Sequence, residues 1–262
     1  MDASTVPLAP SRLVPTPFAL ALLVLSMLVL VPGDGARAAD RGGLTRLDLG
    51  VKAGPALSQH QGTEGRDLEY DVSSTLRRGG AAGVFVVLPV TRRFHLQQEV
   101  LLVQKGSRQE IGVDILDVPA VLDVEYDMVY VEIPLLLRYH WYDGRSLDVY
   151  TLGGFGFGLK IDDRYQLDGE VSDGTETIAV TADSDMSEVD LFDFFFTYGT
   201  GLEFPVGGSR MLVEYRFDLS LQQLPLPTYA YVPFGEDDEI LVENDPVPLR
   251  NQSHMLLVGF RF

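Results

Sequence analysis

The sequence predicts an all-β protein, an eight-stranded antiparallel up-and-down transmembrane β-barrel with short periplasmic turns and long extracellular loops. Three observations lead to this fold class. Apolar and polar residues alternate with period two over segments longer than ordinary soluble strands. Short turns and long connections alternate between these segments, as in outer-membrane barrels. An export signal begins the chain, and no later apolar run approaches the length of a membrane-spanning helix.

Residues 1–38 are expected to be a cleaved signal peptide. An apolar run extends from Phe18 to Val31, and the small residues Ala36 and Ala38 provide a cut site. The run is shorter than the roughly 20 residues that a spanning helix needs, which argues against an N-terminal anchor. Residues 39–262 would then form the outer-membrane β-barrel domain, giving a location in the cell outer membrane.

Composition excludes several classes of function. The chain has no cysteine, so disulfides, thiolate metal sites and cysteine catalysis are ruled out. Its formal net charge of −18, without a basic stripe, argues against nucleic acid as a partner. No motif points to a cofactor. No apolar run after Val31 is long enough for a spanning helix. The chain can therefore enter a membrane only as a closed barrel, in which the strands pair every backbone group with a neighbour.

The clearest strand is VYVEIPLLLRYHWY, residues 129–142. Apolar residues occupy one parity and end in Tyr139 and Trp141, which are expected at a membrane interface. The other parity carries Glu132, Arg138 and His140. Pro134 within it predicts a bulge or a local break in the ladder, because proline lacks the backbone donor.

Similar alternation marks the other segments in chain order. Before this strand it is found at 47–54, 84–90 and 94–106, and after it at 147–160, 192–204, 211–220 and 254–262. The glycine-rich segment 147–160 leaves its outward parity open. Together these give eight strands, and an even number is what a bacterial single-chain barrel requires.

The connections differ strongly in length. Short turns of hairpin composition are expected at 89–93, 143–146 and 206–209. Long connections, which carry most of the acidic residues of the chain, are expected at 58–79, 107–127, 161–188 and 222–250. This asymmetry favours a membrane barrel with both termini in the periplasm. A soluble lipocalin-like barrel remains the rival, because it also alternates but buries its apolar face inward.

Ten charged or titratable residues fall on the presumed inward parity. An eight-stranded barrel is just wide enough for side chains to fill it, so these residues are expected to form ion pairs that plug the lumen. A proton or ion path is the alternative. The set comprises Glu99, Lys105, Glu132, Arg138, His140, Glu203, Glu214, Arg216, Asp218 and Arg261.

Catalytic and metal-binding motifs are not expected. The four histidines, His60, His95, His140 and His254, have no ligand spacing. Ser253 beside His254 would fit a lipid-acting serine enzyme only if an acid and an oxyanion donor lay nearby. No pattern in the sequence supplies them.

Several stretches, taken in order, resemble the PorT-like outer-membrane β-barrel family (outer membrane protein beta-barrel domain). They are LGVKAGPALS (49–58), QEVLLVQKG (98–106), YVEIPLLLRY (130–139), YTLGGFGFGL (150–159), YGTGLEF (198–204) and VEYRFDLSL (213–221). The terminal VGFRF resembles the insertion signal read by the barrel assembly machinery, with Val258, Phe260 and Phe262 as its apolar positions.

Composition, motifs and resemblance together favour a non-enzymatic protein. The expected role is structural or interacting, through acidic extracellular loops. Its expected partners are outer-membrane lipid, the assembly machinery during insertion, and a protein outside the cell or in a secretion machine. The resemblance implies one alternative, an accessory part of a type IX secretion or gliding system. A barrel enzyme acting on lipid is a second alternative.

Overall fold

A computed structural model describes residues 47–61, 71–115, 118–172, 177–184, 191–234 and 238–262. The predicted signal peptide, residues 1–38, lies outside these ranges. None of the described residues forms a helix with the length and hydrophobicity needed to span a bilayer.

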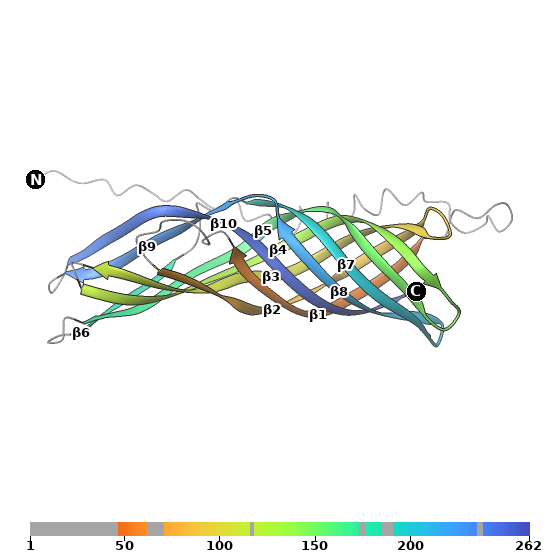
Figure 1. The fold of residues 1–262 in the computed structure, drawn as a ribbon, viewed down its shortest axis with the longest axis horizontal. Helices are drawn as coiled ribbons and strands as arrows, with labels where there is room; N and C mark the ends of the chain where they lie inside the picture. Colours follow the sequence, from red (N-terminus) through yellow and green to blue (C-terminus); the bar gives the residue numbers. More distant parts are fainter. Residues whose placement is uncertain (1–46, 62–70, 116–117, 173–176, 185–190, 235–237) are drawn as a thin grey trace, which may run out of the picture. The chain divides into compact units, whose positions relative to one another are not determined.

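The described residues form ten antiparallel strands (Figure 1). Their bounds are β1 Asp48–Gln61, β2 Asp71–Pro89, β3 Phe94–Ile115, β4 Val118–Asp143, β5 Asp148–Ser172, β6 Thr177–Ser184, β7 Phe192–Val206, β8 Ser209–Ser220, β9 Leu224–Phe234 and β10 Asp238–Arg261.

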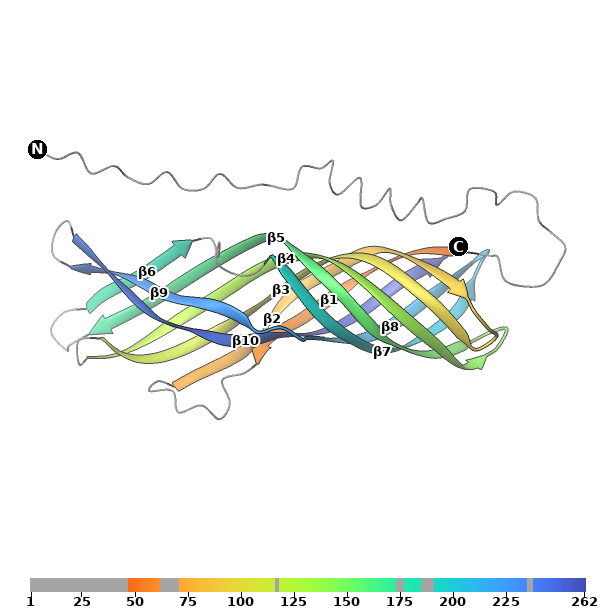
Figure 2. The same cartoon turned by 90° about the horizontal axis from the view of Figure 1, so that it is seen from above.

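Eight of these strands close into a barrel. Each pairs with its neighbours in the order β1-β2-β3-β4-β5-β7-β8-β10, and β10 pairs back onto β1 (Figure 2). The closing ladder runs from Gly50 opposite Arg261 to Gln61 opposite Arg250. The amide of Phe262 donates to the carbonyl of Leu49 at 2.8 Å, so the last residue is also tied to the first strand. The predicted eight-stranded antiparallel fold is confirmed.

The three short turns lie where the sequence predicts them. They join β2 to β3, β4 to β5 and β7 to β8, and Gly207 in the last of them has a φ of 62°, which favours glycine. All three gather at the end of the barrel where the C-terminus lies (Figure 1). This is the periplasmic end of the predicted arrangement.

The long extracellular connections are present, but much of their length is strand. β3 and β4 continue as a hairpin to Ile115 and Val118, while β6 pairs with β5 and β9 pairs with β10. In β4, Leu122 and Val124 are buried and the intervening Asp123 is exposed. The period-two alternation therefore continues above the apolar band, with acidic residues replacing apolar ones on the outer face. That replacement makes these strands resemble acidic loops in the sequence.

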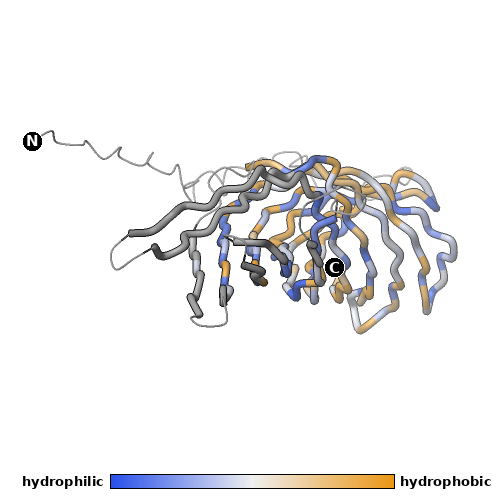
Figure 3. Tube along the Cα trace, turned by 60° about the vertical axis from the view of Figure 1, so that its left-hand side comes forward, coloured by the Kyte–Doolittle hydropathy of each residue, from blue (hydrophilic) through white to orange (hydrophobic). Residues whose placement is uncertain are grey.

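The outer wall is apolar and the inner side carries the charged residues beside small apolar clusters, which separates this barrel from the lipocalin-like alternative. On β4 the outward Leu135 and Leu137 are about half exposed, whereas the inward Arg138 and His140 are buried. A soluble barrel would show the reverse arrangement. The hydropathy along the trace shows alternating apolar and polar positions on the barrel strands (Figure 3).

Pro134 interrupts the ladder without shifting it. The β3–β4 pairing runs to Gln98 opposite Leu135 and resumes at Leu101 opposite Glu132 in the same register. The Gln98 side-chain amide donates to the carbonyl of Pro134 at 2.9 Å. The predicted local break is therefore found on the β3 side. The alternative, a bulge at Pro134, is wrong, because the pairing with β5 stays regular there at Gly156.

Gly156 leaves space for Pro134, and this gives a testable prediction. A Cβ at Gly156 would lie 2.5 Å from the ring of Phe195 and 2.8 Å from the Cα of Pro134. Gly156→Ala should lower the free energy of unfolding by about 1–3 kcal/mol through overpacking, measured by urea titration of the refolded barrel. Gly153→Ala is the matched control, because its Cβ would meet nothing closer than 3.6 Å. Equal stability of the two variants would contradict this account.

Candidate functional site

The barrel interior is the candidate site, because it holds the charged residues predicted to face inward. Nine of the ten are buried, and the side chain of the tenth, Arg261, is 11% exposed. Their inward direction follows from the alternation of each strand. The contacts described below place them in three layers along the barrel.

The central layer spans the lumen from wall to wall. Arg216 on β8 makes a bidentate pair with Glu99 on β3, with both N–O distances at 2.8 Å. In the closed strand order, β3 and β8 lie opposite each other, with three strands between them in either direction. A single pair of side chains therefore crosses the barrel.

Lys52 and Glu214 complete this layer. Lys52 donates to Glu99 at 2.7 Å and to Glu214 at 2.8 Å, and Arg216 also donates to Glu214 at 2.8 Å. The Tyr150 hydroxyl donates to the other oxygen of Glu214 at 2.9 Å. Two cations thus meet two carboxylates, and the formal charge of the central layer is balanced.

The layer nearest the short turns is centred on Glu203. Its carboxylate accepts from Arg138 at 2.6 Å, from Arg261 at 2.7 Å and from Arg210 at 3.3 Å. Arg261 also donates to Asp48 at 2.7 Å. In the same layer, outside the Glu203 cluster, His140 hydrogen-bonds to Asp148 at 2.8 Å.

The third layer lies on the extracellular side of the centre. Lys105 pairs with Glu132 at 2.5 Å and lies 3.6 Å from Asp193. The hydroxyl of Thr197 donates to Asp218 at 2.7 Å. Three carboxylates gather around one lysine here, and all four of these charged side chains are buried.

Sequence reasoning omitted four buried charged residues, of which Lys160 on β5 pairs with Asp163 outside the three layers. The other three, Lys52, Asp148 and Asp193, take part in the contacts above. For two of them the signal was present, because Lys52 lies between the outward Val51 and Ala53, and Asp193 alternates with phenylalanines. Asp148 follows a short turn, where the parity of a strand is hard to read.

The two aromatic residues predicted at the interface lie together near the short turns. Trp141 is 64% exposed and contacts Tyr139 edge-on, with ring centroids 4.8 Å apart. The Trp141 indole donates to the hydroxyl of Thr151 at 3.1 Å, and Arg93 donates to the Tyr139 hydroxyl at 3.3 Å. Their position, at the edge of the exposed apolar wall, is the one that amphipathic rings favour at a membrane interface.

The C-terminal positions that resemble an insertion signal all point outward. Val258, Phe260 and Phe262 are exposed at the end of the chain. Their role in recognition by the assembly machinery stays a prediction.

Ser253 and His254 do not form a catalytic pair. Ser253 is buried inside the barrel, whereas His254 points outward, where its Nδ1 lies 2.7 Å from the Tyr215 hydroxyl. Successive residues of a strand point to opposite faces, so the two side chains cannot meet. In the part of the chain that the structure describes, no group of three or more His, Asp or Glu residues is arranged to hold a metal ion.

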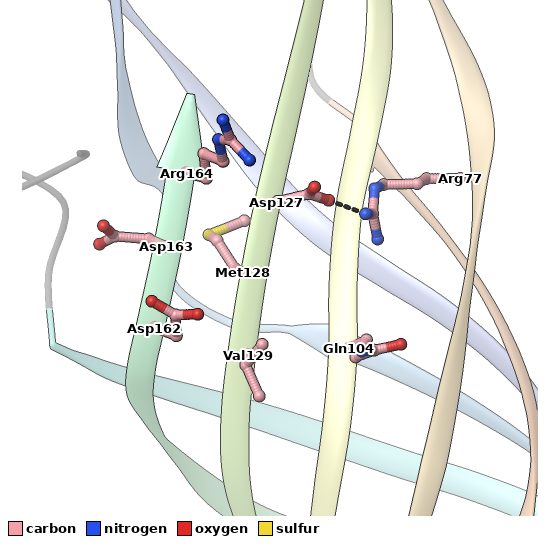
Figure 4. Close-up of a pocket in the computed structure, with 8 residues that line it drawn as sticks. All are labelled: Arg77, Gln104, Asp127, Met128, Val129, Asp162, Asp163 and Arg164. Carbon is pink, nitrogen blue, oxygen red and sulfur yellow. Dashed lines mark ion pairs between the residues drawn. The ribbon is translucent and has the colours of Figure 1, made fainter. Parts of the chain in front are cut away.

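A small cavity lies on the wall of the barrel, above the apolar band (Figure 4). Its volume is about 210 Å³. Arg77 forms ion pairs with Asp127 and, at 3.3 Å, with Glu125, and Arg164 and Asp162 also line or border this region. Charges of both signs occur together here, so the cavity presents no strong preference for an ion of one sign.

Comparison with known proteins gives distant structural similarities. Among curated proteins, none matches the sequence significantly. The outer membrane protein OprG from Pseudomonas aeruginosa is similar in structure, with 11% identity, a TM-score of 0.39, and coverage of 82% of this chain and 95% of that chain. The outer membrane protease OmpT from Escherichia coli is also similar, with 6% identity, a TM-score of 0.43, and coverage of 85% of this chain and 99% of that chain.

The family follows from the sequence match. Residues 36–224, well over half of the chain, match the family model described as "Outer membrane protein beta-barrel domain". This range takes in the strands from β1 to β8 and the buried charges on them. The chain belongs to the outer membrane protein beta-barrel domain family, and its location is the cell outer membrane.

Proposed function

We propose that this protein is a non-enzymatic outer-membrane barrel whose lumen is closed by charged side chains and whose extracellular strands serve as an interaction surface. The observation that carries the proposal is the pair between Arg216 and Glu99, which joins opposite walls of the barrel. A side-chain bridge of this kind occupies the space through which a solute would pass.

The geometry of the central layer supports a closed lumen. Lys52, Glu99, Glu214 and Arg216 are all buried, and Arg216 and Glu214 have no exposed surface at all. The interior of an eight-stranded barrel is only wide enough for side chains to fill it. Removing one ionic partner would leave a buried charge uncompensated, so the layer is held in place by the cost of opening it.

The outer ends of the long strands support the interaction role. Asp123, Asp162 and Asp168 are exposed on β4 and β5, above the apolar part of the wall. Paired strands hold these carboxylates at fixed spacing, which a mobile loop would not do. With a net charge of −18, the chain would favour partners with basic surfaces and disfavour acidic ones.

A second candidate is an accessory role in a type IX secretion or gliding system. It is supported by the stretches that resemble PorT-like proteins, which form parts of β1, β3, β4, β5, β7 and β8. Deletion of the gene in the source organism should then impair both secretion of the exported cargo and gliding, with restoration by the intact gene. A deletion strain with normal secretion and motility would remove this candidate.

The central layer gives a prediction about stability. Glu99→Leu should lower the free energy of unfolding by about 3–5 kcal/mol, because Lys52 and Arg216 lose a buried partner. Glu125→Leu is the matched control, since its pair with Arg77 is partly exposed and should be worth no more than about 1 kcal/mol. Both are measured by urea unfolding of the refolded barrel.

A double variant separates charge balance from loss of contacts. Lys52→Met combined with Glu99→Leu leaves Arg216 paired with Glu214, so the layer stays neutral. The double variant should be more stable than Glu99→Leu alone, although it removes more polar groups. If it is less stable than the single variant, charge balance does not govern this layer.

Conductance in planar bilayers tests whether the lumen is closed. The purified protein should show no long-lived open channel, because Arg216 and Glu99 cross the lumen. Replacing both by alanine removes the bridge without leaving a net charge, and should produce measurable current. Arg77→Ala with Glu125→Ala, on the outer wall, should stay silent. A stable channel in the unaltered protein would overturn the closed-lumen proposal.

A further inference from the structure

Two histidine rings meet inside the barrel near the short turns. His95 on β3 and His140 on β4 have ring centroids 4.1 Å apart, with their planes tilted by 45°. The two residues are far apart in sequence and have no ligand spacing. The hairpin brings them together, because its register places His95 opposite Arg138, two residues before His140.

Asp148 fixes the orientation of His140. The Nδ1 atom of His140 lies 2.8 and 2.9 Å from the two carboxylate oxygens of Asp148. A carboxylate can only accept, so Nδ1 carries a proton and Nε2 is the ring nitrogen left to bind a metal ion. A carboxylate on the far nitrogen is the arrangement that orients metal-ligating histidines and raises their basicity.

Both rings carry a buried nitrogen that lacks a partner. Within the described part of the chain, neither Nε2 of His140 nor Nδ1 of His95 has a hydrogen-bonding partner. A buried polar atom left unpaired costs free energy, so each of these atoms calls for a ligand. The two atoms belong to rings that contact each other directly.

The arginines and carboxylates around the two imidazoles are paired with one another. The cations Arg138, Arg210 and Arg261 are matched by the three carboxylates Asp48, Asp148 and Glu203, which they contact. Neutral imidazole is the form that binds metal ions.

We propose that His140 Nε2 and His95 Nδ1 form a two-imidazole site for a divalent transition-metal ion, with water completing its coordination. Imidazole suits Cu²⁺, Zn²⁺ and Ni²⁺, and Cu²⁺ is bound most tightly by a given nitrogen site. Closed structural zinc sites have four protein ligands. A metal ion held by only two protein ligands keeps water in its other coordination positions and exchanges with the solution.

A cavity at the short-turn end borders one of the two ligands. His140 borders a cavity of about 350 Å³ that is also lined by Arg92, Arg93 and Trp141. The ion would therefore enter and leave on the periplasmic side, while the central layer separates the site from the extracellular side. Metal binding here is independent of the proposed role of the extracellular strands.

Electron paramagnetic resonance of Cu²⁺ added to the refolded protein tests the site. One equivalent of Cu²⁺ should give hyperfine structure from two imidazole nitrogens. His95→Ala keeps the His140–Asp148 pair and should reduce the signal to one nitrogen, with at least a tenfold loss of affinity. Asp148→Asn, which keeps both ligands, should weaken binding by about 10–100-fold.

His254→Ala is the matched control, because His254 lies on the outer wall and should not affect the signal. Circular dichroism of each variant must match that of the unaltered barrel. Two results would overturn the proposal: a Cu²⁺ signal unchanged in His95→Ala with His140→Ala, or no nitrogen hyperfine structure in the unaltered protein. In the second case, water alone satisfies the two nitrogen atoms.

Discussion

Closure of the sheet by β1 and β10 is the constraint on which the rest of the structure depends. In a bilayer every backbone amide and carbonyl needs a partner, and an open sheet edge would leave a row of them unpaired. The ladder from Gly50 opposite Arg261 to Gln61 opposite Arg250 removes that edge. Once the sheet is closed, one parity of each strand must face lipid and the other must face the lumen.

The narrow lumen explains why the buried charges occur in compensating sets. Side chains from opposite strands come within hydrogen-bonding distance, as Arg216 and Glu99 do. In so small a space each charge needs an opposite one, because water is largely excluded and an unpaired ion is costly. The central and short-turn layers balance their charges, whereas the third gathers three carboxylates around Lys105.

Three barrel strands continue into the extracellular part of the protein, where the proposed interaction surface lies. β3, β4 and β5 pass from the lipid-facing wall into the extracellular region and stay paired there, beyond the break at Pro134 and a register shift between Val129 and Tyr130. Only the chemistry of the outward parity changes, from residues such as Leu135 to residues such as Asp123. The rigid barrel thus presents ordered acidic strands outside the membrane, a surface suited to a partner of opposite charge.

The sequence by itself determined the fold class, the eight barrel strands, the short turns and the parity of most charged residues. Period-two alternation is a local property, so Glu132 and Arg138 could be placed on the inner face without knowledge of any neighbour. The acidic hairpins were harder to recognise, because charge on their outer face hid the alternation.

Only the tertiary structure decided which inward residues meet. Contacts such as Arg216 with Glu99, or His95 with His140, depend on the order and register in which eight strands close. Those are collective properties of all the ladders together, and no single segment encodes them. For the same reason, parity could indicate a charged interior but could not reveal its layers or the pair of histidines.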